Sequence, residues 1–297
     1  MRQNEVPVDI RRGLTRHLLP GRWPGEQVFQ FEYDVAEVAV KAFVQRVRES
    51  DAIYLPMVEA AHWFGQRGYE VIWFEIADIS KGELDNDLLR NPDEMIVRGG
   101  VGTIRQLLER AGRPAPPNID LPSSLSKWIG RRHWPSTMGK IRSAVDSPEF
   151  QPVHIKPLNW HKLFKGTVVK AFRDLIPSAS VSADEPVLVQ ELVEFVSEWR
   201  AFILRDKILN ISNYRGNPLA FPDADAVSAA VAAFEDRPIA FGMDWGITST
   251  GQTLLVEVND GFSLGNYGLR GPEYTAIIEA RWRQLMGLSD NGVGIVP

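Results

Sequence analysis

The stretch LLVEVNDGF, residues 254–262, places two polar residues in a run that otherwise suits a buried strand. Side chains alternate between the two faces of a pleated strand, so Glu257 and Asn259, two residues apart, point to the same face. A carboxylate and an amide are therefore predicted to lie side by side among apolar neighbours. The residues upstream indicate what this pair could face.

A second carboxylate lies on the preceding strand-like run. FGMDWGI, residues 241–247, is separated from TLLVEVND, residues 253–260, by the turn-like segment TSTGQ. If Thr250 and Gly251 form a two-residue hairpin loop, residues whose numbers add to 501 face each other. That register places Asp244 directly opposite Glu257, with Asn259 on the diagonal of the same face.

These three side chains are candidate ligands for a metal ion. Two carboxylates that face each other across a sheet repel unless a positive charge lies between them. A divalent cation meets this need, and carboxylate and amide oxygens are hard ligands that suit Mg²⁺. The alternative is chance, because an ExN pair arises about once in a chain of this length at ordinary residue frequencies.

Length and composition bound the class of protein. The chain has 297 residues, 44% hydrophobic and 24% charged, as expected for a soluble globular protein with two or three subdomains. No apolar run approaches the roughly 20 residues of a membrane span, and the start, MRQNEVPVDIRRG, lacks the apolar core of a secretory signal, so we expect a cytoplasmic protein. The absence of cysteine excludes disulfides and a cysteine nucleophile, and five histidines without HxxxH spacing argue against a zinc enzyme.

The charge of the chain is unevenly distributed. The formal net charge of −5 argues against an extended nucleic-acid surface. Residues 98–142 nevertheless carry nine lysines and arginines against two acidic residues. This stretch is either a solvated basic face or a wall that faces an anionic ligand, and composition does not decide between them.

The first part of the chain alternates between helix-like and strand-like segments. We expect helices at residues 35–49, 58–68 and 101–112, and strands at residues 68–76 and 95–100. Strands that alternate with helices predict a small α/β unit with a parallel sheet. Residues 113–124, RPAPPNIDLPSS, are rich in proline and polar residues and are predicted to be a linker.

The second part is richer in strands. Five strand-like runs are PVHIKP, VLVQELVEF, AFILRDKILNIS, PIAFGMDWGI and TLLVEVND, and the helices among them are predicted at residues 224–235 and 272–286. Mostly antiparallel sheet with helices on one side is an α+β arrangement.

Several cationic and polar residues on these strands are candidates for binding an anionic ligand. Lys156 ends the VHIKP strand, where Pro157 stops the ladder, and could hold a phosphate oxygen; a solvated lysine is the commoner alternative. The run VLVQELVEF contains Gln190 and Glu191, and such a segment can offer a nucleobase an apolar slot and hydrogen bonds.

The SEWR segment adds an acid and a base. Glu198 and Arg200 share one side of a strand. Glu198 could accept hydrogen bonds from ribose hydroxyls, and Arg200 could fork onto a phosphate or a carboxylate. A structural Glu–Arg surface pair is the alternative.

Taken together and in this order, the segments IKP, VQELVEFVSEWR, MDWG and LVEVND resemble an ATP-grasp enzyme. GGVGTIRQLLERAG, PPNIDLP and RRHWPS make the sequence most similar to the R2K clade of that superfamily. The resemblance implies an ATP-grasp fold: a Rossmann-like α/β pre-grasp domain followed by two α+β grasp subdomains with antiparallel sheets. The expected boundaries are 1–120 for the pre-grasp domain, 121–190 for the subdomain with the lysine strand and lid, and 191–297 for the subdomain with the magnesium-binding strands.

The resemblance also implies roles for individual residues. Asp244, Glu257 and Asn259 would bind Mg²⁺. ATP would be held by Lys140 and Lys156 at its phosphates, by Gln190, Glu191 and Val193 at its adenine, and by Glu198 at its ribose. Lys127 is the second choice for the position given to Lys140. Arg200, together with Lys156, would stabilise the transferred phosphoryl group or an acyl-phosphate.

The function implied by the resemblance is an ATP-dependent carboxylate–amine ligase that releases ADP and phosphate through an acyl-phosphate. The expected partners are a small-molecule, amino-acid or peptide carboxylate and an amine, without membrane or nucleic acid, and a homodimer stays open. Two alternatives are a phosphotransferase on the same scaffold and an ATP-binding regulator without turnover.

Overall fold

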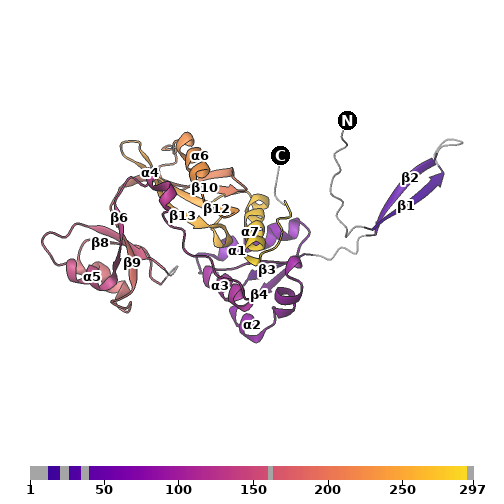
Figure 1. Ribbon diagram of the computed structural model, residues 1–297, viewed down its shortest axis with the longest axis horizontal. Helices are drawn as coiled ribbons and strands as arrows, with labels where there is room; N and C mark the ends of the chain where they lie inside the picture. Colours follow the sequence, from indigo (N-terminus) through magenta and orange to yellow (C-terminus); the bar gives the residue numbers. More distant parts are fainter. Residues whose placement is uncertain (1–12, 21–26, 35–39, 160–162, 293–297) are drawn as a thin grey trace. The chain divides into compact units, whose positions relative to one another are not determined.

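The computed structural model describes residues 13–20, 27–34, 40–159 and 163–292 (Figure 1). Residues 1–39 form a compact unit of their own, in which β1 (Gly13–Pro20) pairs with β2 (Gln27–Asp34) as an antiparallel hairpin. All other elements belong to residues 40–297. Among the helices of the described residues, none is both long and apolar enough to cross a bilayer.

A three-stranded parallel sheet begins the larger unit. Its strands follow the order β4-β3-β5, with bounds β3 (Lys41–Gln45), β4 (Glu70–Phe74) and β5 (Met95–Arg98). Its helical segments are α1 (Tyr54–Gln66), α2 (Ile76–Lys81), η1 (Asn86–Arg90), η2 (Pro92–Glu94) and α3 (Val101–Arg110). The predicted α/β unit is confirmed, and α1 stops just before Gly68, whose φ of 84° lies in the left-handed region that glycine adopts readily.

One predicted helix is wrong. The helix expected at residues 35–49 is replaced by β3, which is the central strand of the parallel sheet; residues 35–39 lie outside the described part. Ala42, Phe43 and Val44 are consecutive and all buried, because a central strand is covered on both faces. A continuous apolar run of this kind has no strand period, so periodicity alone does not separate it from a buried helix.

Two four-stranded antiparallel sheets follow. The first, which we call the lysine sheet, has the order β6-β9-β7-β8; the second, the carboxylate sheet, has the order β11-β10-β12-β13. The bounds are β6 (His133–Thr137), β7 (Val153–Pro157), β8 (Thr167–Val169), β9 (Pro186–Glu191), β10 (Phe195–Leu204), β11 (Lys207–Gly216), β12 (Ala240–Thr248) and β13 (Thr253–Asp260). The predicted α+β arrangement is confirmed, although two of the five strand-like runs each contribute to two strands.

Helical segments accompany both sheets. They are η3 (Ser123–Leu125), α4 (Ser126–Ile129), α5 (Met138–Ala144), η4 (Phe172–Ser178), α6 (Ala224–Ala233), η5 (Gly261–Ser263) and α7 (Gly271–Met286). The helices α6 and α7 correspond to the two that the sequence predicts in this part.

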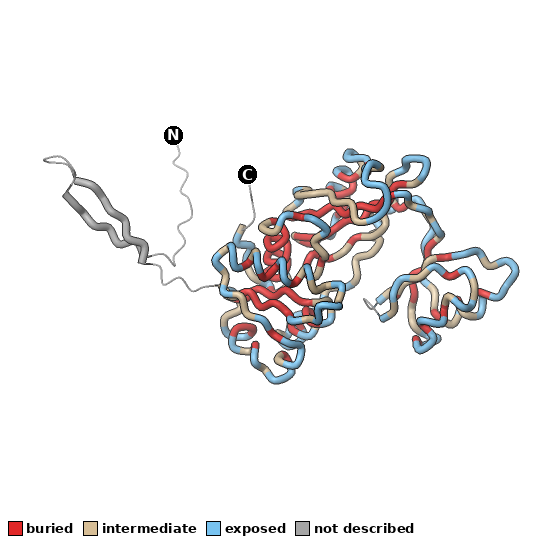
Figure 2. Tube along the Cα trace, turned by 180° about the vertical axis from the view of Figure 1, so that it is seen from behind, coloured by how far each residue is buried: buried red, intermediate tan, exposed pale blue. Residues whose placement is uncertain are grey.

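Helix α7 connects the parallel sheet to the end of the carboxylate sheet. Most of its residues are buried (Figure 2). The indole N–H of Trp282 donates to the carbonyl of Met95 at the start of β5 (2.8 Å). Arg281 forms a two-pronged ion pair with Asp260, the last residue of β13 (2.7 and 2.5 Å). The strand that carries Glu257 and Asn259 is therefore fixed at its end from the far side of the core.

Candidate active site

The hairpin of β12 and β13 brings the two predicted carboxylates together by a route that differs from the predicted one. Thr248 and Gln252 close the turn, so the loop has three residues, with Gly251 at a φ of 80°, and the predicted two-residue loop is wrong. In the part of the hairpin next to this loop, the numbers of paired residues add to 500, as for Ile247 and Thr253. A β-bulge at Val256 then shifts the register by one. The predicted pairing of Asp244 with Glu257 is thereby confirmed.

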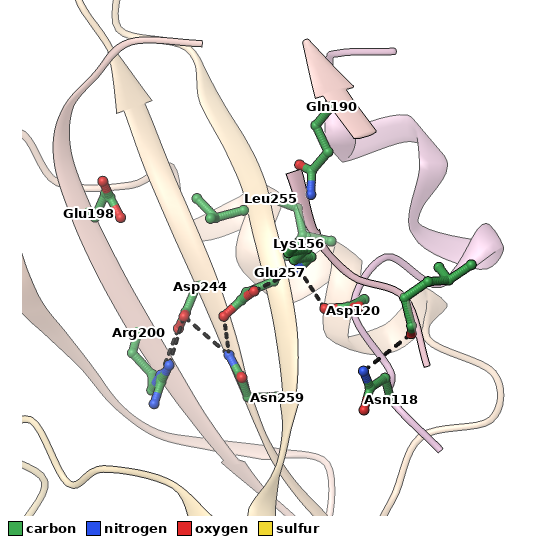
Figure 3. Close-up of polar contacts among 12 residues, drawn as sticks. Asn118, Asp120, Lys156, Gln190, Glu198, Arg200, Asp244, Leu255, Glu257 and Asn259 are labelled. Carbon is green, nitrogen blue, oxygen red and sulfur yellow. Dashed lines mark hydrogen bonds and ion pairs between the residues drawn. The ribbon is translucent and has the colours of Figure 1, made fainter. Parts of the chain in front are cut away.

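Asn259 lies between the two carboxylates. Its Nδ2 donates to Asp244 Oδ2 (3.2 Å) and to Glu257 Oε1 (3.1 Å), so the three side chains converge on one face of the carboxylate sheet (Figure 3). Arg200, on β10, faces Asp244 across the ladder and grips both of its oxygens (2.6 and 2.7 Å). Arg200 and the amide of Asn259 therefore offset the repulsion between the paired carboxylates. Lys156 offsets it as well.

The side chain of Lys156 extends from the lysine sheet to a residue of the carboxylate sheet. It lies near the end of β7, and its Nζ contacts Glu257 Oε2 (2.8 Å) and Asp120 Oδ1 (2.5 Å). Burial alone would raise the pKa of Glu257, but the charge and hydrogen bond of Lys156, the amide of Asn259 and the charge of Arg200 together outweigh burial and hold that pKa at about 2. Glu257 is consequently ionised at neutral pH.

A cavity of ≈ 530 Å³ opens beside this ion pair. Residues of both sheets line it, together with the segment 192–194 that joins β9 to β10. Six predicted binding residues are among them: Lys156, Gln190, Glu191, Val193, Glu198 and Glu257. The volume lies within the range of about 300–1,000 Å³ that is typical of small-molecule sites.

The joining segment 192–194 offers free backbone groups to the cavity. The predicted single strand over residues 187–195 ends at Glu191 and a new one starts at Phe195. No hydrogen bond among the described residues involves the backbone of residues 192–194. The side chain of Glu191 is held by Arg132, which donates from its backbone N–H (2.8 Å) and from Nε (2.5 Å).

Glu198 is already engaged at the opposite wall of the cavity. Tyr214 donates its hydroxyl to one carboxylate oxygen (2.9 Å), and the largely exposed Arg215 donates to the other (2.6 Å). The alternative interpretation, a surface pair of Glu198 with Arg200, is wrong, because Glu198 pairs with Tyr214 and Arg215 while Arg200 pairs with Asp244.

The donor chemistry of the cluster suits a hard divalent cation. Asp244 and Glu257 supply carboxylate oxygens, and the amide oxygen of Asn259 accepts no hydrogen bond from a described residue. With Asp120, the cluster contains three carboxylates against the two cations Lys156 and Arg200, a net charge of −1. No group of three or more histidine, cysteine, aspartate or glutamate ligands is preassembled among the described residues, so the amide is needed to complete the set.

Comparison with known families identifies the architecture. The sequence profile of the ATP-grasp domain, R2K clade family 2, matches residues 128–277, half of the chain. The chain belongs to the R2K clade of ATP-grasp proteins. The predicted family and the predicted ATP-grasp fold are both confirmed.

Solved structures agree on the fold of this R2K-clade protein. One similar crystal structure is that of the D-cycloserine synthetase DcsG, with 12% identity and a TM-score of 0.55 over 82% of this chain and 99% of that one. Another is that of a RimK domain ATP-grasp protein from Sphaerobacter thermophilus, with 16% identity and a TM-score of 0.52 over 81% of this chain and 98% of that one. An L-amino acid ligase from Bacillus licheniformis is similar as well (9%, 0.52, 84% and 76%). No curated protein matches the sequence at a significant level. At these identities the likeness concerns the fold.

Two predicted cations lie apart from the cavity lining. Lys140 is an exposed residue of α5, whose backbone N–H is capped by Thr137 (3.4 Å), and Lys127 lies over the ring of Trp128, 5.3 Å from its centroid. The basic stretch 98–142 does not form one surface, because its arginines are used separately. Arg110 pairs with Asp85, and Arg142 donates to the carbonyls of Ser178, at the end of η4, and of Val181.

Arg131 is one of the cavity residues that sequence reasoning missed, and it links the two sheets. Its Nε donates to Gln190 Oε1 (2.9 Å), while Nη1 and Nη2 donate to the carbonyls of Leu255 (2.7 Å) and Val256 (2.8 Å). It thus joins the lysine sheet to the β-bulge that sets the position of Glu257. Its only sequence signal is its place in RRHWPS, where it was one of nine basic residues.

Proposed function

We propose that this R2K-clade ATP-grasp protein is an ATP-dependent carboxylate–amine ligase that works through an acyl-phosphate and releases ADP and phosphate. The observation that carries the proposal is the convergence of Lys156 on Glu257 at the wall of a nucleotide-sized cavity, beside the cluster of Asp244, Asn259 and Arg200. The D-cycloserine synthetase and the L-amino acid ligase among the similar folds support it.

The nucleoside end of ATP would occupy the cavity beside the joining segment. The free N–H and C=O groups around Val193 can pair with the edge of adenine, as buried bases require. Gln190 is buried and oriented by Arg131, so it can act as a fixed polar contact. Glu198 would exchange its exposed partner Arg215 for ribose hydroxyls, because Arg215 is the less buried of its two donors.

The phosphate end would lie against the cations. Lys156 and Arg131 both line the cavity, and we assign Arg131, in place of Lys140, as the second cation toward the phosphates. Asp244, Glu257 and Asn259 would hold Mg²⁺. When bound, this ion supplies the charge neutralisation that phosphoryl transfer requires.

Arg200 would contact the transferred phosphoryl group. Its Nε and Nη2 are occupied by Asp244, whereas Nη1 makes no hydrogen bond to a described residue. The pair keeps Arg200 charged, and the pKa of its guanidinium is raised by Asp244 despite burial. A substrate carboxylate would take the terminal phosphoryl group of ATP, and an amine would then displace phosphate. Positioning and neutralisation of charge supply the rate in such a step.

An ADP-release screen tests the proposal. The purified chain is incubated with Mg²⁺, ATP and panels of amino acids and peptides, and products are identified by mass spectrometry. We expect ADP and phosphate in proportion to an amide product. A phosphorylated product without release of phosphate would indicate the phosphotransferase, and ATP binding without ADP for any candidate would indicate the regulator.

A further inference from the structure

Asp120, in the PPNIDLP segment, has no role in the proposed function so far, yet it lies in the cluster. The segment is irregular, as predicted for a linker, but Asp120 forms an isolated antiparallel bridge with Val258, whose N–H donates to its carbonyl (2.7 Å). Val258 separates Glu257 from Asn259 on the edge strand of the carboxylate sheet. The linker is thereby attached to the strand that carries the predicted ligands.

The side chain of Asp120 makes a different contact from its backbone. Its carboxylate contacts Lys156 Nζ at 2.5 Å, and Glu257 contacts the same nitrogen at 2.8 Å, so Lys156 lies between them (Figure 3). The three side chains are largely shielded from water, with exposed fractions of 17%, 12% and 31% for Asp120, Lys156 and Glu257. Charges in such surroundings interact more strongly than on an open surface.

We propose that Asp120 is a positioning residue that shares the charge of Lys156 and so leaves Glu257 available to a divalent cation. This inference rests on the proposed function, because it assumes that a nucleotide and Mg²⁺ bind at the cavity. Asp120, Lys156 and Glu257 together carry a net charge of −1. Without the carboxylate of Asp120, the net charge of these three residues is zero. Of the two carboxylates that Lys156 contacts, only that of Glu257 then remains.

The backbone conformation of Asp120 allows its two roles to be separated. Its φ of 51° lies in the left-handed region, which asparagine and glycine accept more readily than other residues. Both Asp120→Asn and Asp120→Gly therefore keep the bridge to Val258. The first removes only the charge, and the second removes the whole side chain. Asp206 is a matched control, because its φ is 67° and it forms an ion pair with Arg237 (2.5 Å), but it does not line the cavity.

The test is calorimetric titration of ADP, first in EDTA and then at increasing Mg²⁺, with wild type, D120N, D120G and D206N. In the Asp120 variants we expect metal-free ADP to bind about five- to tenfold tighter, because a negative charge has left the site. We expect the Mg²⁺ concentration that gives half of the maximal change in ADP affinity to rise about tenfold. D206N is expected to match wild type in both titrations.

The opposite signs of the two shifts are the signature of the proposal. If both affinities fall together in D120N and D120G, Asp120 has only a structural role and the inference is overturned. If neither shifts relative to D206N, it is overturned as well, while the proposed function stands. If wild type itself binds no ADP with or without Mg²⁺, the proposed function fails and the inference fails with it.

Discussion

The two antiparallel sheets that border the cavity differ in their packing and in the predicted site residues that they carry. In the carboxylate sheet, every residue of β12 from Ala240 to Ile247 is buried, and α6 and α7 contribute to the apolar clusters around it. The lysine sheet has a smaller core, and its outer strands expose Trp134 on β6 and Val168 on β8. The predicted oxygen ligands therefore lie on the more deeply buried sheet, whereas Lys156 contacts Glu257 from the more exposed one.

This difference suggests a division of labour. A buried platform keeps oxygen ligands at fixed positions, as a metal site requires. The less buried lysine sheet, which carries Lys156, can adjust to a ligand more easily, because fewer apolar contacts oppose its movement. Substitutions in the carboxylate sheet should therefore reduce stability first, and substitutions in the lysine sheet should reduce binding first.

The largest effect is expected for Asp244→Asn in the carboxylate sheet. The variant leaves the buried Arg200 without a charge partner, so the free energy of unfolding should fall by about 3–5 kcal/mol. Urea denaturation measures it. As a control, Asp85→Asn breaks the more exposed pair with Arg110 and should reduce stability far less. Equal losses of unfolding free energy in the two variants would show that the Asp244–Arg200 pair of the carboxylate sheet does not contribute more to stability than the exposed pair.

The lysine sheet should show a pH-dependent stability that comes from His154. Burial, with help from Lys156, lowers the pKa of His154 from 6.5 to about 4. Between these values the unfolded chain binds a proton that the folded chain does not, so stability falls as pH falls, by about 3 kcal/mol across the window. Denaturation at several pH values measures this slope.

Two variants assign the slope to its source. His154→Asn should flatten the dependence between pH 6.5 and 4, while His133→Asn, at an exposed residue of β6, should leave it unchanged. An undiminished slope in His154→Asn would mean that other groups control the acid stability.

Gly246→Ala tests how closely the carboxylate sheet shapes the cavity. A Cβ at this position of β12 would lie 2.2 Å from the ring of Phe195, which lines the cavity. We expect overpacking to cost about 1–3 kcal/mol and the affinity for ADP to fall as the ring is displaced. Thermal unfolding and calorimetry measure the two effects. Gly102→Ala on α3, where no atom lies within 4 Å of the added Cβ, is the control and should not destabilise.

The smallest effect distinguishes Arg131 and Lys140, two cations that flank β6 in the chain. Arg131→Ala should weaken ADP binding about tenfold, because it removes a cavity charge and releases the carbonyls of the β-bulge. Lys140→Ala should change it less than about twofold, since exposed charges outside a site contribute little. A larger loss for Lys140→Ala would restore the assignment made from the sequence.

Contacts between residues close in the chain could be predicted from the sequence, whereas contacts between distant residues could not. Asp244 opposite Glu257 was predictable, because strand alternation and a nearby turn restrict the register to a few choices. The β-bulge was not, although it corrected an error in the predicted loop. The use of Arg131 could not be foreseen either, since its carbonyl partners at Leu255 and Val256 lie more than a hundred residues away. The contact of Asp120 with Lys156 depends likewise on a bridge to Val258 that leaves no local pattern.

Binding of Mn²⁺, a paramagnetic substitute for Mg²⁺, tests most directly whether the cluster at the cavity holds a metal–nucleotide complex. Electron paramagnetic resonance of free Mn²⁺ would be followed as the protein is added with and without ADP, for wild type and Glu257→Gln, while calorimetry in EDTA checks that the variant still binds ADP. The account predicts that wild type removes Mn²⁺ from solution in an ADP-dependent manner and that Glu257→Gln loses this binding but keeps metal-free ADP. Equal ADP-dependent uptake of Mn²⁺ by the variant would contradict it.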